Sequence, residues 1–353
     1  MKPALRRIHR YLSLALALVW CVQLATGALL VFAREYDDAT LAGPARPFDA
    51  QALGRRIEAL PAAGLTFKYL QPSGGKPGRY DLFVARGDQP NRILRIDGQG
   101  AILRERPSGS AFPAPGLMRT ALKMHETLFL GANGLTFMGV SGIVLLSNIV
   151  IGLKLAWPMA GQWRRALWPR RSKTPAGTLF GWHRAAGLAI GLPLAVTVTA
   201  GIVLAIGDPV KAALNGSWPT PQVAPGGAVT VSPGQAMTLA LARHPGATLS
   251  LMMPPSDERP FWRVEMRQPG ELRRVFGGTR VLVDARDGRI LADNDALKAP
   301  PMVAVFQSFY AIHTGEAAGL AGRILLLAVT LGGLALGVMG VLLWTARRRL
   351  RRG

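Results

Sequence analysis

Histidine is the residue type in this sequence with the clearest chemical potential, because four of its five copies recur in two matched sets. His9 and His183 are each followed by an arginine and then by a long apolar run. His125 and His313 each precede a glycine-rich apolar run. A neutral imidazole is a common metal ligand, and two facing imidazoles can bind a metal ion or the two axial faces of a haem. These four histidines are the first candidates for a functional site.

The spacing around these histidines indicates an internal duplication. His9 lies 18 residues before Gly27, and His183 lies 18 residues before Gly201. The sequence offset between the two members of this set is 174 residues, and the offset between His125 and His313 is 188. The second offset also relates Gly131, Gly134 and Gly152 to Gly319, Gly322 and Gly340. A parallel repeat of this kind places equivalent side chains about a pseudo-two-fold axis along the membrane normal.

The elements that must position these histidines are four apolar stretches, each long enough to cross a bilayer, which needs roughly 20 apolar residues. They run from Tyr11 to Ala33, from about Leu135 to Trp157, from Ala185 to Gly207 and from Ile324 to Ala346. The first is longer than the apolar region of a signal peptide, and we expect an uncleaved span. An apolar content of 49% with 18% charged residues also excludes a disordered chain.

The formal net charge of +22 predicts membrane topology. Three segments outside the spans contain fourteen basic residues and no Asp or Glu. These residues are Lys2, Arg6, Arg7, Arg10, Arg164, Arg165, Arg170, Arg171, Lys173, Arg347, Arg348, Arg349, Arg351 and Arg352. Because Lys and Arg accumulate in cytoplasmic loops, both termini and the short central loop are expected in the cytoplasm. The charge therefore needs no nucleic acid as a partner, and the lipid bilayer is the expected one.

The remaining segments, 34–120 and 208–310, are expected on the far side of the membrane. Both contain alternating polar and apolar runs bounded by Gly, Asp and Pro, which is typical of antiparallel hairpins. A short helix is expected before each set, over Gln51–Leu60 and Gly234–Ala242. The pattern predicts two small α+β modules.

The predicted fold class is thus a membrane α-helical protein with four transmembrane helices from an internal duplication and two periplasmic α+β modules. The boundaries are 1–33 for the first span with its cytoplasmic N-terminus, 34–120 for module 1, 121–157 for the His-containing lead-in and second span, 158–177 for the basic cytoplasmic loop, 178–207 for the third span, 208–310 for module 2, 311–346 for the His-containing lead-in and fourth span, and 347–353 for the basic cytoplasmic tail.

The ligand set favours haem over zinc. Zinc sites have three or four protein ligands, and no Cys, Asp or Glu is placed to complete a set at His9 and His183. A bis-histidine haem needs only two ligands on facing helices, with small residues nearby such as Gly187, although glycines here could equally serve helix packing or helix breaking. The single Cys21 leaves no C-x-x-C-H attachment motif, so any haem is non-covalent b-type.

Other candidate residues have two interpretations each. Arg10 and Arg184 could pair with haem propionates or could be topology charges. Trp20 lies about midway along the first span and could be an electron relay or simply pack against its neighbours. His244 falls outside the repeat and is expected in a surface loop.

The sequence resembles the PepSY-associated transmembrane proteins, often called iron-regulated membrane proteins. The resemblance covers almost the whole chain and rests on Ile8-His9-Arg10, Trp182-His183-Arg184, His125-Glu126 with Gly131 and Gly134, and His313-Thr314-Gly315-Glu316 with Gly319 and Gly322. It implies an inner-membrane ferric-siderophore reductase of the ferrioxamine type with two b haems, one held by His9 and His183 on the cytoplasmic side and one by His125 and His313 on the periplasmic side. The implied substrate is a ferric siderophore or other ferric chelate, with electrons from an unidentified cytoplasmic donor or the quinol pool.

Two other functions stay open at this point. A non-enzymatic PepSY membrane protein would bind or regulate a periplasmic partner with structural histidines, and a metal-ion transporter would carry iron or copper through the His pairs. The transporter is disfavoured because broken helices and charged residues at the midplane are missing from the sequence. For a reductase, ligands at opposite interfaces would set the two haem levels on the order of 30 Å apart, which is long for direct electron transfer.

Overall fold

A computed structural model describes residues 2–40, 43–109 and 116–349 of the 353-residue chain. It contains two compact units. The first comprises Met1–Val31, Thr120–Pro209 and Ile312–Gly353, and the second comprises Phe32–Arg119 and Val210–Ala311. Arg351 and Arg352, two of the predicted topology charges, lie outside the described residues.

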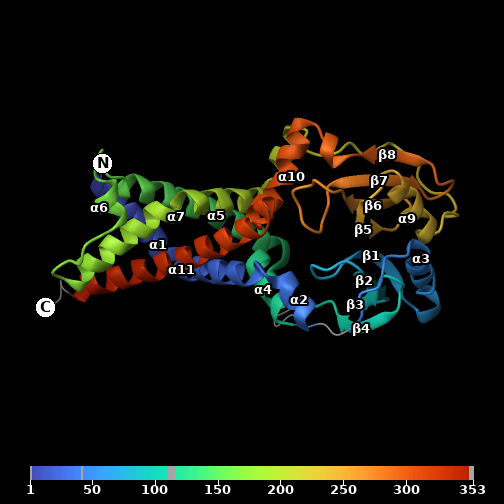
Figure 1. Cartoon of the computed structure of the whole chain (residues 1–353), viewed down its shortest axis with the longest axis horizontal. Coiled ribbons are helices and arrows are strands. Elements are labelled where there is room, and N and C mark those ends of the chain that lie inside the picture. The colour runs from blue at the N-terminus through green and yellow to red at the C-terminus, as the bar shows by residue number, and fades with distance from the viewer. Residues whose placement is uncertain (1, 41–42, 110–115, 350–353) are drawn as a thin grey trace. The chain divides into compact units, whose positions relative to one another are not determined.

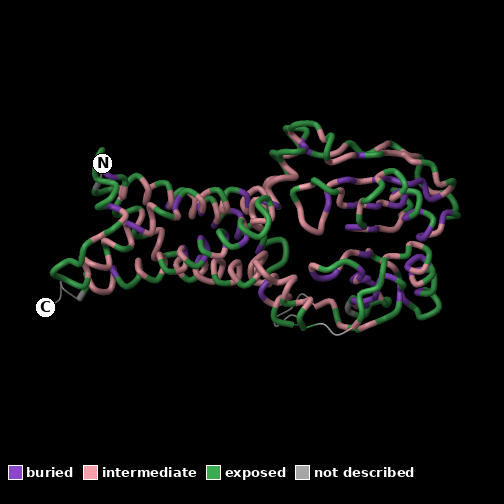
Figure 2. Tube along the Cα trace, viewed as in Figure 1, coloured by how far each residue is buried: buried purple, intermediate pink, exposed green. Residues whose placement is uncertain are grey.

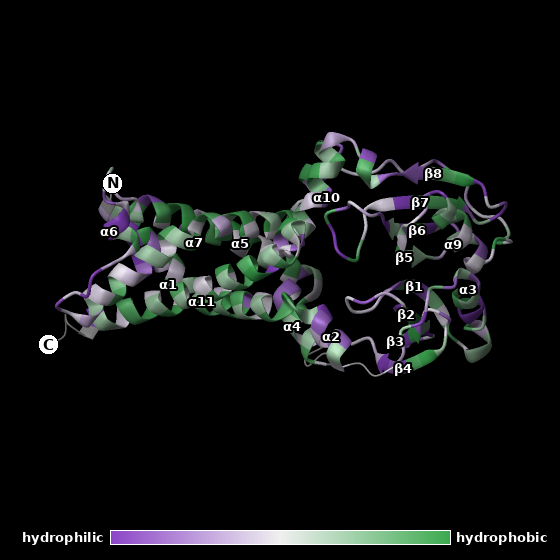
Figure 3. Ribbon diagram, viewed as in Figure 1, coloured by the Kyte–Doolittle hydropathy of each residue, from purple (hydrophilic) through white to green (hydrophobic). Residues whose placement is uncertain are grey.

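The first unit is a bundle of four long helices (Figure 1), which are α1 (Lys2–Leu30), α5 (Gly131–Ala156), α7 (Pro175–Ile206) and α11 (Gly319–Arg349). All four are long and apolar enough to cross a membrane, and hydrophobic residues dominate their ribbons in Figure 3. The four predicted spans are therefore confirmed as candidate membrane helices. A short helix, α6 (Trp163–Leu167), lies in the basic connection between α5 and α7.

The four helices form a ring in which α1 and α7 each pack against both α5 and α11. Over the described residues, α1 and α7 are not closely packed against each other, and neither are α5 and α11. Glycines allow the closest approach, because a Cβ at Gly139 or Gly142 of α5 would come within 2.5 or 2.8 Å of an isoleucine of α7. Most of the bundle residues are exposed or half-buried (Figure 2), as expected for helices whose outer faces contact lipid.

Sharp turns precede two of the long helices. Helix α4 (Leu117–Thr127) leads to α5 through Leu128 and Phe129, whose φ angles of 49° and 64° are left-handed. Gly131 and Gly319 begin α5 and α11 with φ angles of 60° and 59°, and a Cβ at either would have no neighbour within 4 Å. These two glycines therefore allow the backbone to turn, because a residue with a side chain is strained at a positive φ angle.

The second unit is built on one antiparallel sheet with strand order β4-β3-β2-β1-β5-β6-β7-β8. The strands are β1 (Thr66–Pro72), β2 (Arg79–Arg86), β3 (Gln89–Asp97), β4 (Ile102–Pro107), β5 (Thr248–Met253), β6 (Phe261–Arg267), β7 (Thr279–Asp284) and β8 (Ile290–Asn294). Helices α3 (Ala50–Glu58) and α9 (Pro233–Ala242) precede the two sets of four strands and pack against each other. The remaining elements are α2 (Ala33–Thr40), α8 (Asp208–Ala213), α10 (Pro301–His313) and the 3-10 turns η1 (Pro61–Ala63), η2 (Ala296–Lys298) and η3 (Glu316–Ala318).

The expectation of two modules needs one correction, because the two segments share a sheet and a core. Strands β1 and β5 pair through Leu70 and Met252, and both side chains are completely buried. One cluster of buried apolar residues continues from α3 and β1–β3 to α9 and β5–β7. Each segment supplies a helix followed by antiparallel strands, as expected, and the number of strands is four in each. Joining β1 to β5 removes two edges that would expose unpaired backbone groups.

The opposite face of the sheet carries a buried ion pair. Asp81 of β2 accepts two hydrogen bonds from Arg95 of β3, at 2.8 and 3.0 Å, and only 8% and 3% of these side chains are exposed. Arg106 lies 3.4 Å from the same carboxylate. Burial also raises the pKa of Asp37, which lies 3.9 Å from Arg95. Among the described ion pairs of the sheet unit, Asp81–Arg95 is the one in which both side chains are buried.

Candidate functional site: two histidine pairs

The structure brings together the two histidine pairs that the repeat predicts. The ring centroids of His9 on α1 and His183 on α7 are 6.5 Å apart, with an interplanar angle of 69°. His125 in the last turn of α4 and His313 at the end of α10 have centroids 6.0 Å apart and an angle of 46°. The first pair spans a diagonal of the bundle, across which the two helices are not in close contact.

Three of the imidazoles are oriented by the same kind of hydrogen bond. Nδ1 of His9 donates to the carbonyl of Asn148 at 3.1 Å, Nδ1 of His125 to that of Gln23 at 3.1 Å, and Nδ1 of His313 to that of Thr197 at 3.0 Å. A proton held on Nδ1 leaves Nε2 with its lone pair, which is the form that ligates a metal. Among the four paired histidines, the closest polar contact described for an Nε2 atom is the amide nitrogen of Gln23, 3.5 Å from Nε2 of His125.

Each imidazole lies against a glycine on another helix. A Cβ would come within 2.9 Å of His9 at Gly152, within 3.1 Å of His125 at Gly27 and within 2.8 Å of His313 at Gly201. The fourth contact, between Gly340 and His183, is looser at 3.7 Å. In all four cases the residue whose carbonyl faces the imidazole lies four residues before the glycine. Because the glycine has no side chain, the ring can reach that carbonyl.

His183 is held less firmly than the other three. The carbonyl of Leu336 is its equivalent partner, but Nδ1 is buried without a hydrogen bond of ordinary distance and angle. In the first pair, His9 is therefore held by a hydrogen bond to a backbone carbonyl, whereas His183 has no such bond of ordinary geometry.

Side chains on α1 and α5 support His9 and His125. Asn148, whose carbonyl binds His9, donates through Nδ2 to Ser13 Oγ at 2.8 Å and ties α5 to α1. Thr26 Oγ1 lies 3.2 Å from Nδ1 of His125, and the Gln23 amide donates to the His125 carbonyl at 3.0 Å. Sequence reasoning missed these residues, although polar side chains inside membrane spans are a signal of function.

The pairs fit a haem iron better than a bare metal ion. With a metal–imidazole bond of about 2.0 Å on each side of one iron, two opposed imidazoles have centroids roughly 6 Å apart, close to the 6.0 and 6.5 Å found. Burial lowers the pKa of His125 to about 4 and also lowers that of His313, which favours the neutral imidazole that a metal requires. Among the described residues, no group of three or more His, Cys, Asp or Glu could hold a metal ion.

The two arginines beside the inner histidines have different surroundings. Arg184 donates through Nε to the carbonyl of Ala156 at 2.8 Å, and thus satisfies the C-terminal end of α5. Arg10 is exposed and lies over the ring of Tyr11. Their role toward a propionate stays a prediction. A buried arginine that sequence reasoning missed, Arg323 near the start of α11, donates to the carbonyl of Val31 at 3.2 Å.

Trp20 is buried between α1 and α5, where its Nε1 donates to Ser141 Oγ at 3.0 Å. The distance along the bundle between the His9–His183 pair and the His125–His313 pair is shorter than the sequence suggested. Gln23 and Gly27, which contact His125, lie 14 and 18 residues after His9, or about 21 to 27 Å along the helix. The earlier estimate was too long because the outer histidines lie back against the last turns of α1 and α7 rather than beyond their ends.

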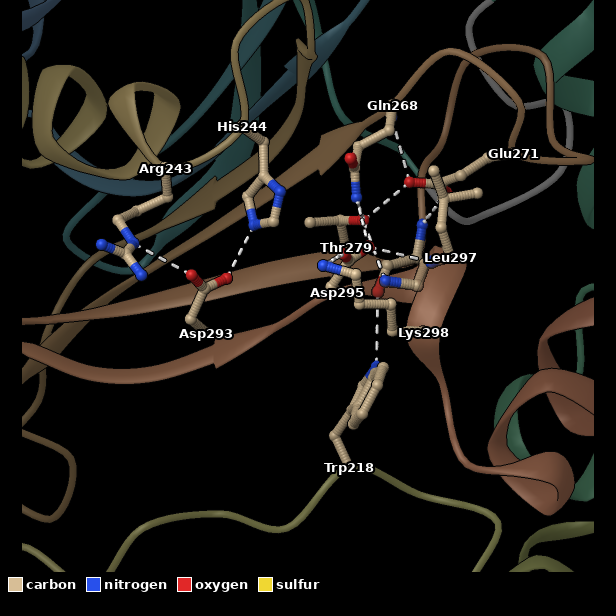
Figure 4. Close-up of polar contacts among 12 residues, drawn as sticks. Trp218, Arg243, His244, Gln268, Glu271, Thr279, Asp293, Asp295, Leu297 and Lys298 are labelled. Atoms are coloured by element: carbon tan, nitrogen blue, oxygen red, sulfur yellow. Dashed lines mark hydrogen bonds and ion pairs between the residues drawn. The ribbon is translucent and has the colours of Figure 1, made fainter.

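His244 belongs to the sheet unit, as its place outside the repeat suggests, but it is not a free surface residue. Its side chain is only 9% exposed and lies 2.6 Å from Asp293, which also binds Arg243 (Figure 4). Together with Trp218, Gln268, Asp295 and Lys298 these residues line a cavity of about 570 Å³. Within it the carboxylates of Asp293 and Asp295 are already paired with neighbouring side chains.

Four apolar helices long enough to span a bilayer, together with a separate sheet-rich unit, define a multi-pass membrane protein with a folded extramembrane part. The chain belongs to the family of the PepSY-associated TM region, which it matches over residues 6–347. No curated protein matches the sequence.

Proposed function

We propose that the chain is a di-haem b oxidoreductase of the bacterial inner membrane that reduces a ferric chelate, such as a ferric siderophore, in the periplasm. His9 and His183 would hold the cytoplasmic-side haem, and His125 and His313 the periplasmic-side haem. The observation that carries the proposal is the geometry of the four imidazoles, whose ring centroids are paired at 6.5 and 6.0 Å and three of which direct Nδ1 to a backbone carbonyl.

A bound haem would supply a one-electron carrier at each level. The residues of the chain hold and orient it. Backbone carbonyls fix the ring protons of His9, His125 and His313 on Nδ1, and the glycines beside these rings allow them to approach the helix backbone closely. Apolar helices around both pairs exclude water, which tunes the reduction potential.

The contacts of the histidines at corresponding positions of the two halves also support an internal duplication. His9 with Asn148 and Gly152 corresponds to His183 with Leu336 and Gly340 at the offsets found in the sequence, and the same holds for the two outer histidines. The basic segments support cytoplasmic termini, which would place the sheet unit in the periplasm.

The ferric chelate is proposed from the family resemblance together with coordination chemistry. Hard oxygen ligands hold ferric iron more strongly than ferrous iron, so one electron weakens the chelate and releases the metal. The electron would come from a cytoplasmic donor or from quinol.

The test is reoxidation of the reduced protein. Detergent-purified protein is reduced with a stoichiometric amount of dithionite and mixed without oxygen with ferrioxamine B or ferric citrate and a chromogenic ferrous trap. We expect the reduced haem spectrum to decay while the ferrous complex forms, with one ferrous ion for each electron lost. His125→Ala should slow this reaction by about tenfold or more, because it removes a ligand of the outer haem. Haem that stays reduced with every ferric chelate would contradict the substrate part of the proposal.

A further inference from the structure

His183 is the least constrained of the four paired histidines, by two independent observations. Its Nδ1 is buried without a well-formed hydrogen bond, whereas the other three Nδ1 atoms each lie 3.0 or 3.1 Å from a carbonyl oxygen. Its ring is also the farthest from its glycine, at 3.7 Å against 2.8–3.1 Å for the others. Neither the hydrogen bond nor the close packing that fixes its counterparts is therefore complete.

Two positions beside His183 also lack the polar side chains found at the corresponding positions beside His9. On the His9 side, Asn148 binds Ser13 and joins α5 to α1 directly beside the ring. At the matching sequence offsets, the α7 and α11 side has Gly187 and Leu336, which cannot form such a bond. A Cβ at Gly187 would meet nothing within 4 Å, so the space one turn along from His183 is open.

An imidazole with a satisfied Nδ1–H resists rotation away from a metal, and loss of that partner weakens metal binding. Resting on the proposed haem function, we propose that His183 is an exchangeable ligand and that a small π-acceptor molecule, carbon monoxide in the test below, binds the ferrous inner haem in its place. The bond from Nε2 of His183 to the ferrous iron would break and a bond from the iron to the carbon of carbon monoxide would form, with no change in oxidation state. His9 would stay bound.

The inference predicts an asymmetry between the two haems. At the outer pair both His125 and His313 donate from Nδ1 to a carbonyl and lie tightly against a glycine. We expect carbon monoxide to bind the inner haem about tenfold more tightly than the outer haem, the difference that loss of one hydrogen bond and its packing can produce.

The experiment compares each haem alone in the full-length chain. His125→Ala/His313→Ala leaves the inner pair intact, and His9→Ala/His183→Ala leaves the outer pair intact. Both proteins and the parent are reduced with excess dithionite and titrated with carbon monoxide while the visible spectrum is recorded. We expect the inner-haem variant to bind carbon monoxide, the outer-haem variant to keep its spectrum at the same concentration, and the parent to bind one molecule per two haems.

Equal binding at both haems, or at neither, would overturn the inference while leaving the haem proposal intact. Absence of haem from the parent protein would instead overturn the proposed function. The parent titration keeps the test decisive if a double variant does not fold.

The infrared C–O stretch identifies the displaced histidine, because it reports the ligand on the opposite side of the iron. The carbon monoxide complex of His183→Ala should match that of the parent, since His9 is the opposite ligand in both. The complex of His9→Ala should differ. A parent spectrum that matches His9→Ala instead would assign the exchange to His9 and contradict the inference.

Discussion

Gly201→Ala is expected to cost the protein its outer haem, whereas Gly340→Ala keeps both haems. The Cβ added at position 201 would lie 2.8 Å from Cε1 and 3.1 Å from Nδ1 of His313, well inside contact distance. The ring must then move away from α7 and lose its hydrogen bond to the Thr197 carbonyl. At position 340 the nearest atom of His183 is 3.7 Å away, which is an ordinary contact.

The comparison isolates the close approach of the imidazole, because both substitutions are glycine to alanine in a long apolar helix, where alanine is the better helix former by about 1 kcal/mol. Haem content is measured per chain by pyridine haemochrome after purification, with size-exclusion elution as the control for folding. We expect about half of the haem to be missing in Gly201→Ala. Equal haem content in both variants would show that the glycine contacts do not position the ligands.

Asp81→Ala is expected to destabilise the sheet unit by about 3 to 5 kcal/mol. The substitution leaves Arg95, whose side chain is 3% exposed, without the carboxylate that binds its Nε and Nη2. Among the described residues, the other carboxylate that forms an ion pair with Arg95 is Asp37, at 3.9 Å. The cost is that of an uncompensated buried charge rather than that of one hydrogen bond.

The matched control is Glu105→Ala, which breaks an ion pair with Arg92 on the same sheet. Those side chains are 47% and 41% exposed, so the expected loss is about 0 to 1 kcal/mol. Thermal unfolding of the full chain, followed by intrinsic tryptophan fluorescence to which the buried Trp262 of the sheet unit contributes, should show a fall of about 10 °C in the midpoint of that unit for Asp81→Ala. Equal midpoints for the two variants would mean that the Asp81–Arg95 pair is not a significant source of stability.

The histidine pairs and the four spans could be predicted from the sequence because both are local or repeated patterns. An apolar run of span length has few alternative interpretations, and the duplicated spacing relates His9 to His183 and His125 to His313 without any knowledge of the fold. The helices before each strand set were likewise predicted to within two residues at each end, since local sequence determines their caps.

The joined sheet and the details of the site could not be predicted. The pairing of Leu70 with Met252 links strands that are far apart in the sequence. The alternating pattern of a strand is the same whether the strands form one sheet or two, so it does not predict this pairing. The bond from Asn148 to Ser13 depends on how α1 and α5 rotate about their axes, which an apolar run does not reveal. For the same reason the sequence does not reveal the weaker hold on His183, which follows from its distance to Gly340 and from its buried Nδ1 without a hydrogen bond.

The measurement that tests the central claim most directly is a dithionite-reduced minus oxidised visible spectrum of the detergent-purified protein, with pyridine-haemochrome stoichiometry. The protein is expressed with ample haem, beside His9→Ala and His125→Ala. The account predicts two b haems per chain in the parent and the loss of one in each variant, because each substitution removes one ligand from a different pair. A folded parent protein that purifies colourless would contradict it and would favour a PepSY membrane protein that binds or regulates a partner without a cofactor.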